Sequence, residues 1–171
     1  AAVNAHLKPL DLAFGRVVAK AGSKVERIYF PHSGVVSLVV ELNIGEMIET
    51  AMVGRDGVVN AAAALDGKVS FNKGIVQVAG AASVIDVEKI RGLADQLKSF
   101  RALLIRHEQV LFAQSQQSAA CNAFHSIQER AARWLLHAQD RAGDRIDLTQ
   151  EAFAGLLGVQ RGGERRRERD E

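Results

Sequence analysis

Few residues in this sequence have the types and spacing that catalysis or metal binding requires. Cys121 and His125 stand four residues apart, which on a helix places a thiol and an imidazole on one face. Such a pair could bind a metal ion or form an activated nucleophile. No third ligand lies nearby, and packing of the helix explains both residues. The sequence therefore predicts no enzyme, no cofactor and no metal site.

The other polar clusters in the sequence also lack the pattern of a known catalytic or binding site. The sequence has no Walker or dinucleotide fingerprint for phosphate binding. Residues 165–167 are three arginines, but the acidic residues around them favour a solvated tail over a phosphate contact. The stretch 54–57, Gly-Arg-Asp-Gly, is typical of a turn. Two interpretations of this turn are open. In the first it only connects a strand to a short helix, and in the second it also lines a pocket for a small-molecule effector.

The composition is that of a folded, water-soluble protein. With 171 residues, 47% hydrophobic and 25% charged, the chain suits one domain of ordinary size with a small appendage. Its single cysteine excludes an internal disulfide framework and favours a reducing compartment. The sequence contains neither an apolar stretch of membrane-spanning length nor a signal-peptide pattern. We therefore expect a cytoplasmic protein without a membrane partner.

The elements that must position any site fall into two kinds. Residues 14–87 contain short β-branched and aromatic runs separated by glycine turns, which predicts a small barrel or sandwich of strands. Before them, residues 1–11 read as a short leader in which Pro9 makes a turn. Residues 58–65 predict a short helix, and residues 87–97 predict another with Asp86 as its N-cap.

A long helix follows the strands. Residues 99–142 contain no proline or glycine and are rich in residues that favour helices. A seam of Leu103, Val110, Gln117, Phe124 and Ala131 recurs at seven-residue spacing. This pattern predicts a dimer interface, although a surface helix lying on its own β domain is the alternative. The predicted interface comprises Leu103, Leu104, His107, Val110, Leu111, Gln114, Gln117 and Cys121.

The segment 146–161 has the pattern of a helix-turn-helix. Thr149 can cap a helix whose apolar face is formed by Phe153, Leu156 and Leu157. Gly158 then permits the tight turn, and a second helix is expected to begin at residues 160–161. In such motifs the N-terminal residues of the second helix enter the major groove of DNA.

Residues 29–37, 127–136 and 148–159 together resemble the Crp/Fnr family of bacterial transcription regulators, and the resemblance spans about residues 12–161. It implies an α+β fold with an N-terminal β-roll, a double-stranded β-helix that is jelly-roll-like. A long dimerisation helix and a truncated winged helix-turn-helix would follow. The implied domains are a sensing β-roll at 1–98, the dimerisation helix at 99–125, and a partial DNA-binding domain with a charged tail at 126–171.

The resemblance also implies function: a homodimer that binds DNA and responds to a small effector. Thr149 and Gln150 would lie near backbone phosphates. Gln160 and Arg161 would begin the DNA-reading helix, with Arg161 able to pair with guanine. After Arg161 the sequence departs from the family, because two glycines and a charged run follow without an apolar anchor. The alternative is a dimeric ligand-binding or protein-interaction module that has lost sequence-specific DNA binding.

A second departure concerns the effector. Where cyclic-nucleotide-binding relatives carry a Gly-Glu pair, this sequence has Asn60 and Ala61, and it lacks their later phosphate-binding Arg. Without that bidentate contact a cyclic phosphate loses its main charge-assisted hydrogen bonds. We therefore predict an effector other than cAMP or cGMP. Its predicted pocket comprises Arg55, Asp56, Asn60, Asn72 and Lys73.

Overall fold

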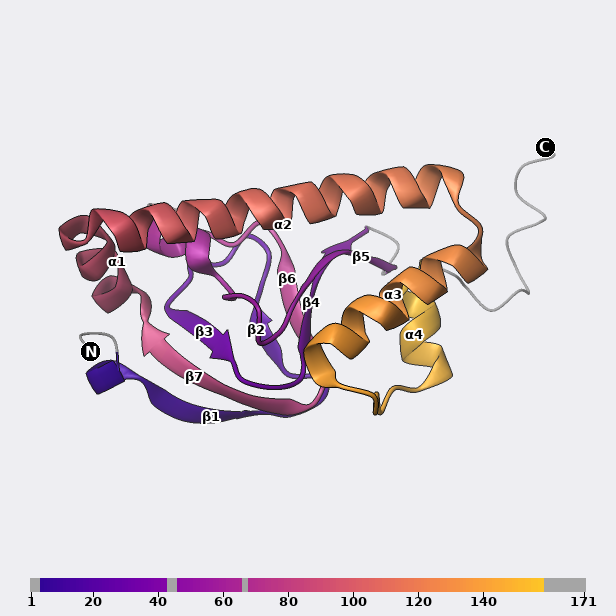
Figure 1. Cartoon of the computed structure of the whole chain (residues 1–171), viewed down its shortest axis with the longest axis horizontal. Helices are drawn as coiled ribbons and strands as arrows, with labels where there is room; N and C mark the ends of the chain where they lie inside the picture. The colour runs from indigo at the N-terminus through magenta and orange to yellow at the C-terminus, as the bar shows by residue number, and fades with distance from the viewer. Residues whose placement is uncertain (1–3, 43–45, 66–67, 159–171) are drawn as a thin grey trace.

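A computed structural model describes residues 4–42, 46–65 and 68–158 and shows an α+β arrangement (Figure 1). A β domain occupies the N-terminal part. The long helix α2 (Lys98–Phe124) runs along one side of it, and α3 (Ile127–Ala142) turns back toward its strands. The fold predicted from the sequence is confirmed. Among the described residues, no helix combines the length and apolar character needed to cross a membrane.

Two antiparallel sheets build the β domain. The three-stranded sheet has the order β1-β7-β3, with the bounds Lys8–Leu12, Gly80–Asp86 and Arg27–Pro31. The four-stranded sheet has the order β2-β6-β4-β5, with the bounds Val17–Ala19, Lys73–Val78, Val35–Glu41 and Met47–Val53. Apolar side chains from both sheets meet in one core, which includes Leu12, Val36, Val53, Val76 and Val84.

Strand β4 is buried on both faces, which explains its nearly unbroken apolar sequence. Val36 points into the core between the sheets. On the opposite face, Val35 and Val39 contact the helices α3 and α4 (Gln150–Leu156). Because side chains alternate along a strand, Ser37 shares that outer face and is also fully buried.

The N-terminal segment corrects one expectation. Pro9 does not form a turn; it lies within β1 and pairs with Ser83 of β7. Strand β1 is at the edge of its sheet, where a residue without an N–H is tolerated. The sequence predicted a turn because this strand is only five residues long, has a weak alternating pattern and contains a proline.

The helical region begins with η2 (Ala61–Leu65), a 3₁₀ helix, and α1 (Val87–Gln96). Their apolar faces pack together with the underside of α2 in a second core. Asp86 occupies the N-cap position of α1, as predicted, but its side chain makes no capping hydrogen bond.

The run 99–142 is two helices and not one. Ser126 and Glu129 form a capping box that starts α3: the Ser126 N–H donates to Glu129 Oε2 at 2.8 Å, and Ser126 Oγ accepts from the Glu129 N–H. The backbone of His125 is extended, so α2 ends at Phe124. The seven-residue seam therefore stops at Phe124, and Ala131 belongs to α3, which packs on the sheet.

Helices α3 and α4 cover the outer face of the four-stranded sheet. Trp134 and Ala138 of α3 pack with Leu156 and Leu157 against a third apolar core. The Trp134 and Phe153 rings lie 5.1 Å apart between centroids. Helix α4, the first helix of the predicted helix-turn-helix, is therefore joined to the β domain by a packed interface.

Candidate functional site

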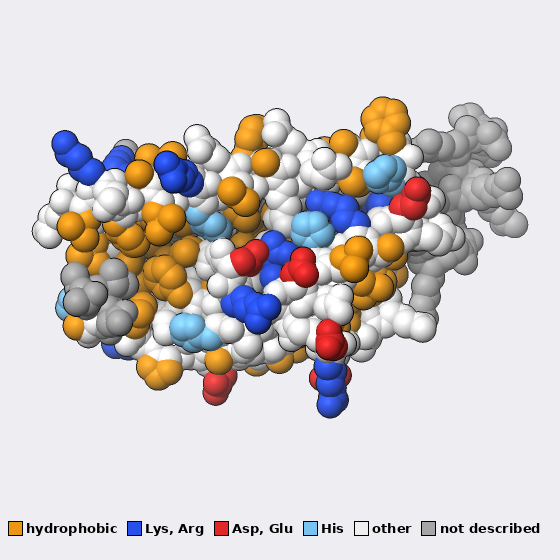
Figure 2. Space-filling view, viewed as in Figure 1, with side chains coloured by type: hydrophobic (Ala, Val, Ile, Leu, Met, Phe, Trp, Pro, Cys, Tyr) orange, Lys and Arg blue, Asp and Glu red, His pale blue; other side chains and the backbone are white. Residues whose placement is uncertain are grey.

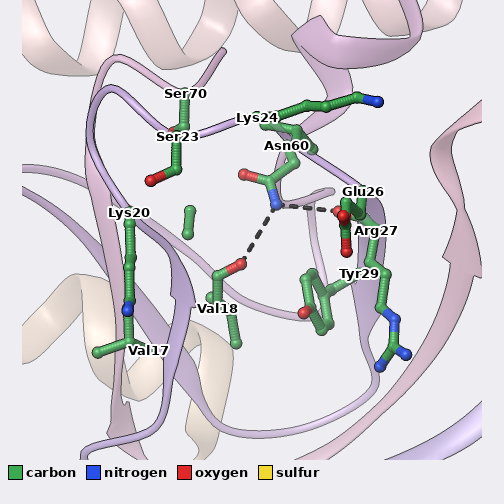
Figure 3. Close-up of a pocket in the computed structure, with 12 residues that line it drawn as sticks. Val17, Val18, Lys20, Ser23, Lys24, Glu26, Arg27, Tyr29, Asn60 and Ser70 are labelled. Atoms are coloured by element: carbon green, nitrogen blue, oxygen red, sulfur yellow. Dashed lines mark hydrogen bonds between the residues drawn. The ribbon is translucent and has the colours of Figure 1, made fainter. Parts of the chain in front are cut away.

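The β domain contains a pocket of about 290 Å³ (Figure 3). Strand β2, the loop after it and the start of β3 form most of its wall, and Asn60 and Ser70 close it. These segments are far apart in sequence and are held together by backbone hydrogen bonds: the Ser70 N–H donates to the Ser23 carbonyl at 3.0 Å, and the Tyr29 and Val59 backbones bond each other. The pocket is therefore part of the packed fold.

Asn60 is the pocket residue with the most distinctive geometry. Its φ of 69° lies in the left-handed region, which glycine adopts freely and asparagine tolerates better than most residues. Its Nδ2 donates to the Arg27 carbonyl at 3.0 Å and contacts the Val18 carbonyl at 3.4 Å (Figure 3). The Asn60 side chain, just before the start of η2, therefore links this helix to strands β2 and β3 and also lines the pocket.

Charged residues surround this pocket without converging in it. Lys20, Lys24, Glu26 and Arg27 all line the wall and are exposed. In Figure 3 the tips of Lys24 and Arg27 point away from the centre of the pocket and from each other. A phosphate placed in the pocket would therefore lack the paired cationic donors that bind phosphates tightly.

The five predicted effector residues do not form one site. Arg55 Nη2 donates to the Asp140 carbonyl of α3 at 2.8 Å, and Asp56 pairs with Arg141 of the same helix at 2.8 Å. Lys73 pairs instead with Glu41 at 3.2 Å, at the far end of β4. Asn72 stands beside Lys73 at the start of β6, and its carbonyl accepts from Ser70 Oγ.

Only Asn60 of this set lines the pocket in Figure 3. The grouping was wrong because the turn at 54–57 faces α3, whereas the residues at 72 and 73 lie across the sheet. Polar residues that are close in sequence, or aligned by resemblance, need not share a cavity.

The predicted dimer residues divide between two faces of α2. Leu104 and Cys121 are each 2% exposed, and Leu111 packs partly into the core. His107 Nε2 lies 2.7 Å from the Val58 carbonyl, and Gln114 Oε1 accepts from the Met52 N–H at 3.0 Å. Leu104, His107, Leu111 and Gln114 attach α2 to its own β domain, and Cys121 is buried. None of the five is therefore available as a main contact for a partner.

The outer face of α2 holds the remaining predicted residues. Leu103 and Val110 are 62% and 64% exposed, and Gln117 is exposed beside them. Further apolar side chains that the seven-residue seam missed, Phe112 and Ile105, are also exposed. Figure 2 shows hydrophobic side chains along the edge of the molecule that α2 forms.

The first helix of the predicted helix-turn-helix is present as α4. Thr149 Oγ1 accepts from the Ala152 N–H at 3.2 Å and caps the helix as predicted. Gln150 is exposed at its first position, and Gly158 adopts a φ of +65° in the turn that follows. The predicted base-reading residues Gln160 and Arg161 lie outside the described residues.

A buried carboxyl that the sequence reading missed connects the sheet to α3. Glu49 Oε2 accepts from Ser37 Oγ and from Trp134 Nε1, the latter at 3.0 Å. Burial raises the pKa of Glu49 to about 7, although these hydrogen bonds, Arg133 and Arg141 act in the opposite direction. The only local signal was a charged residue, beside Thr50, in a strand whose other residues are apolar.

Cys121 and His125 do not form a joint site. Cys121 is buried and Gln117 Nε2 contacts its Sγ at 3.4 Å, whereas His125 is exposed beyond the end of α2. Across the described parts of the chain, no three His, Cys, Asp or Glu residues gather in a way that could hold a metal ion.

No protein-family model and no curated protein matches this sequence. Solved structures do match its fold. A Crp/Fnr-family transcriptional regulator from Eubacterium rectale superposes with a TM-score of 0.76 at 14% identity, over 93% of this chain and 75% of that one. FixK2 from Bradyrhizobium japonicum gives a TM-score of 0.74 at 11% identity, over 90% of this chain and 78% of that one.

A third similar structure is CLP, a c-di-GMP-responsive global regulator from Xanthomonas campestris. Its TM-score is 0.70 at 16% identity, and the match covers 93% of this chain and 83% of CLP. All three matches include the β domain together with the helices that follow it, because a β domain alone would cover little more than half of this chain. The chain therefore has the fold of the Crp/Fnr transcription regulators, as its sequence predicts.

Proposed function

We propose that this chain is a homodimeric, DNA-binding transcription regulator of the Crp/Fnr type. The observation that carries the proposal is the long helix α2, which is packed on the β domain along one face and apolar along the other. The fold of solved regulators over about nine-tenths of the chain supports the same function. A location in the cytoplasm, where DNA is found in bacteria, is part of the proposal.

The proposed dimer forms through the outer face of α2. Its 27 residues extend about 40 Å, long enough for two helices to pack side by side over several turns. Leu103 and Val110 lie two turns apart on the exposed side. Burying such side chains against a second copy is favourable by roughly 25 cal/mol for each Å² of apolar surface removed from water.

In the proposed complex, the DNA-binding segment of each protomer, residues 149–161, contacts one half of a two-fold symmetric DNA site. We call this segment the reader. Gln150, exposed at the start of α4, would contact a backbone phosphate, as would the backbone at the Thr149 cap. Gln160 and Arg161 would begin the helix in the major groove, where arginine recognises guanine by two hydrogen bonds. These roles come from the family resemblance.

The effector proposed for the β domain is not a cyclic nucleotide. Two features support this: the charged groups around the pocket in Figure 3 do not converge, and the alanines of η2 pack into the core under α2. Ala61, which the resemblance aligns with the ribose-binding glutamate of those relatives, is fully buried there.

Selection from a random DNA library tests the proposal. The purified chain is incubated with random duplexes at low salt, bound DNA is amplified, and the cycle is repeated. We expect an enriched sequence with two-fold symmetry whose binding weakens steeply as salt increases, because phosphate contacts release counterions. A library that stays random after selection would overturn DNA reading by this chain.

One observation favours a second candidate function. In the printed sequence Arg161 is followed by two glycines and then by eight charged residues, and this stretch contains no apolar side chain that could anchor a recognition helix. A chain that dimerises through α2 but enriches no DNA sequence would be a ligand-binding or protein-interaction module. The selection above, run beside a measurement of molar mass in solution, separates the two functions.

A further inference from the structure

A second cavity, of about 330 Å³, lies where β5, the turn at 54–57, α2 and α3 meet. We call it the junction cavity. It shares no lining residue with the pocket in Figure 3. In Figure 2, charged and histidine side chains gather over the region between α2 and α3 and are flanked by hydrophobic ones. The cavity therefore contacts both the β domain and the helices that lead to the reader.

The wall formed by β5 and α2 is mainly apolar. Met52 and Val53 end strand β5, and Leu111 of α2, which packs partly into the core, lines the cavity with them. Val110, which is 64% exposed, also lines the cavity. The polar side chains on this wall are His107, Gln114 and Gln117. Gln114 Oε1 is already bonded to the Met52 N–H, and His107 Nε2 lies 2.7 Å from the Val58 carbonyl oxygen. This side of the cavity suits a hydrocarbon or aromatic body of a ligand.

The opposite wall is basic. Arg133, His137 and Arg141 recur at four-residue spacing on α3, so they share one face of the helix and all line the cavity. Asp56 is the only carboxylate among the lining residues that the structure describes, and it pairs with Arg141. Arg133 is held by a weaker contact, 3.3 Å from Nη1 to Ser118 Oγ.

Within the described part of the chain, the two arginines share a single lining carboxylate, Asp56, so this positive charge is only partly compensated. Arg141 is already engaged, because its Nη2 pairs with Asp56 and its Nη1 donates to the His137 carbonyl at 2.9 Å. The pKa of His137 is lowered, first by burial and then by Arg133 and Arg141, although Asp140 and Asp56 act in the opposite direction. The nearby Glu49 also faces these arginines, but with a pKa of about 7 it is ionised only in part at neutral pH.

We propose that the junction cavity binds an amphipathic organic anion of the aromatic carboxylate class. Its carboxylate would lie between Arg133 and Arg141, and its ring would lie on the apolar wall of β5 and α2. A single negative charge fits better than a phosphate dianion, because the carboxylate of Asp56 stands in the same wall.

Such a ligand would contact α2, α3 and β5 at the same time. Binding would stabilise the arrangement in which α3 is seated on the sheet, and would shift the population of reader positions toward it. This regulatory consequence rests on the proposed function. The binding itself does not, because it depends only on the residues of the cavity.

Calorimetric titration of the full 171-residue chain tests the site. The probe is 2-naphthoate, and its neutral isostere 2-naphthamide is titrated in parallel. We expect the carboxylate to bind at least about tenfold more tightly than the amide. Arg133→Gln should weaken naphthoate binding by about tenfold or more, whereas Arg106→Gln, the same change on an exposed part of α2 outside the cavity, should not alter it.

A second variant tests the site without removing charge. Ala113→Phe places a ring at the mouth of the cavity and should weaken naphthoate binding while leaving the arginines in place. Equal affinities for the two probes, or unchanged naphthoate binding in either Arg133→Gln or Ala113→Phe, would overturn the inference. Because no DNA is present, a failure of this test is distinct from a failure of the DNA selection.

Discussion

Replacing Glu49 by glutamine should change how stability depends on pH. The carboxyl lies between the sheet and α3, where it accepts hydrogen bonds from Ser37 and Trp134. A glutamine can still accept both bonds through its amide oxygen, so Glu49→Gln removes the titration while retaining most of the packing. The variant therefore isolates the free-energy cost of ionising this site.

The magnitude follows from the shift of the pKa of Glu49 from 4.5 to about 7. Below pH 4.5 the carboxyl is protonated in both folded and unfolded states and carries no penalty. As the pH rises through this window, the unfolded state releases the proton first, so the wild-type chain loses stability. At about 1.36 kcal/mol for each pKa unit, the full penalty above pH 7 is about 3 kcal/mol.

Urea unfolding followed by circular dichroism, from about pH 5 to about pH 8, measures this difference. We expect the free energy of unfolding of Glu49→Gln to rise relative to the wild type across that range by about 2–3 kcal/mol. The two chains differ at this one residue, so contributions from the rest of the chain cancel in the difference. Glu26→Gln, at an exposed position, is the control. Parallel curves for the wild type and Glu49→Gln would refute the reasoning.

Three further predictions concern the dimer, the reader and the β domain. Val110→Asp should convert a dimer into monomers in light scattering, whereas Gln128→Asp, exposed in the first turn of α3 and outside this face, should not; a dimeric Val110→Asp would exclude this interface. Thr149→Ala should destabilise α4 by about 1 kcal/mol, detected as faster hydrogen exchange in its first turn, and unchanged exchange would contradict the cap. Gly80→Ala should cost about 3 kcal/mol or more in urea unfolding, because its Cβ would lie 2.3 Å from the Ser33 carbonyl oxygen; a fully stable variant would contradict this packing.

Local patterns in the sequence predicted the fold well. Strand β4 follows from its apolar run, and the cap at Thr149 follows from one residue placed before a helical pattern. The break between α2 and α3 depends on Ser126 and Glu129, a capping-box pair three residues apart that the seven-residue seam masked. Pro9 misled the prediction because its tolerance depends on whether a strand lies at the edge of a sheet, which only the tertiary fold decides.

The candidate sites were less predictable, because their residues meet only in three dimensions. Glu49 and Trp134 are 85 positions apart, and nothing near either residue in sequence signals the hydrogen bond between them. The sequence shows that α3 has a basic face, because its arginines and a histidine recur at helical spacing. It does not show the cavity beside this face, because that cavity forms only where β5 and the turn after β5 pack against α2 and α3. Asp56 was chosen for an effector pocket, and its pairing with Arg141 places it at the junction instead.

The position of Trp134 has a practical consequence. It is the only tryptophan in the chain, it is 5% exposed, and its indole N–H is bonded to Glu49 of the sheet. Indole emission moves to longer wavelength when the ring enters water, so movement of α3 away from the sheet would be visible as a red shift. The protein thus contains an optical reporter between α3 and the sheet, with which ligands, DNA and variants can be compared on one scale without an attached label.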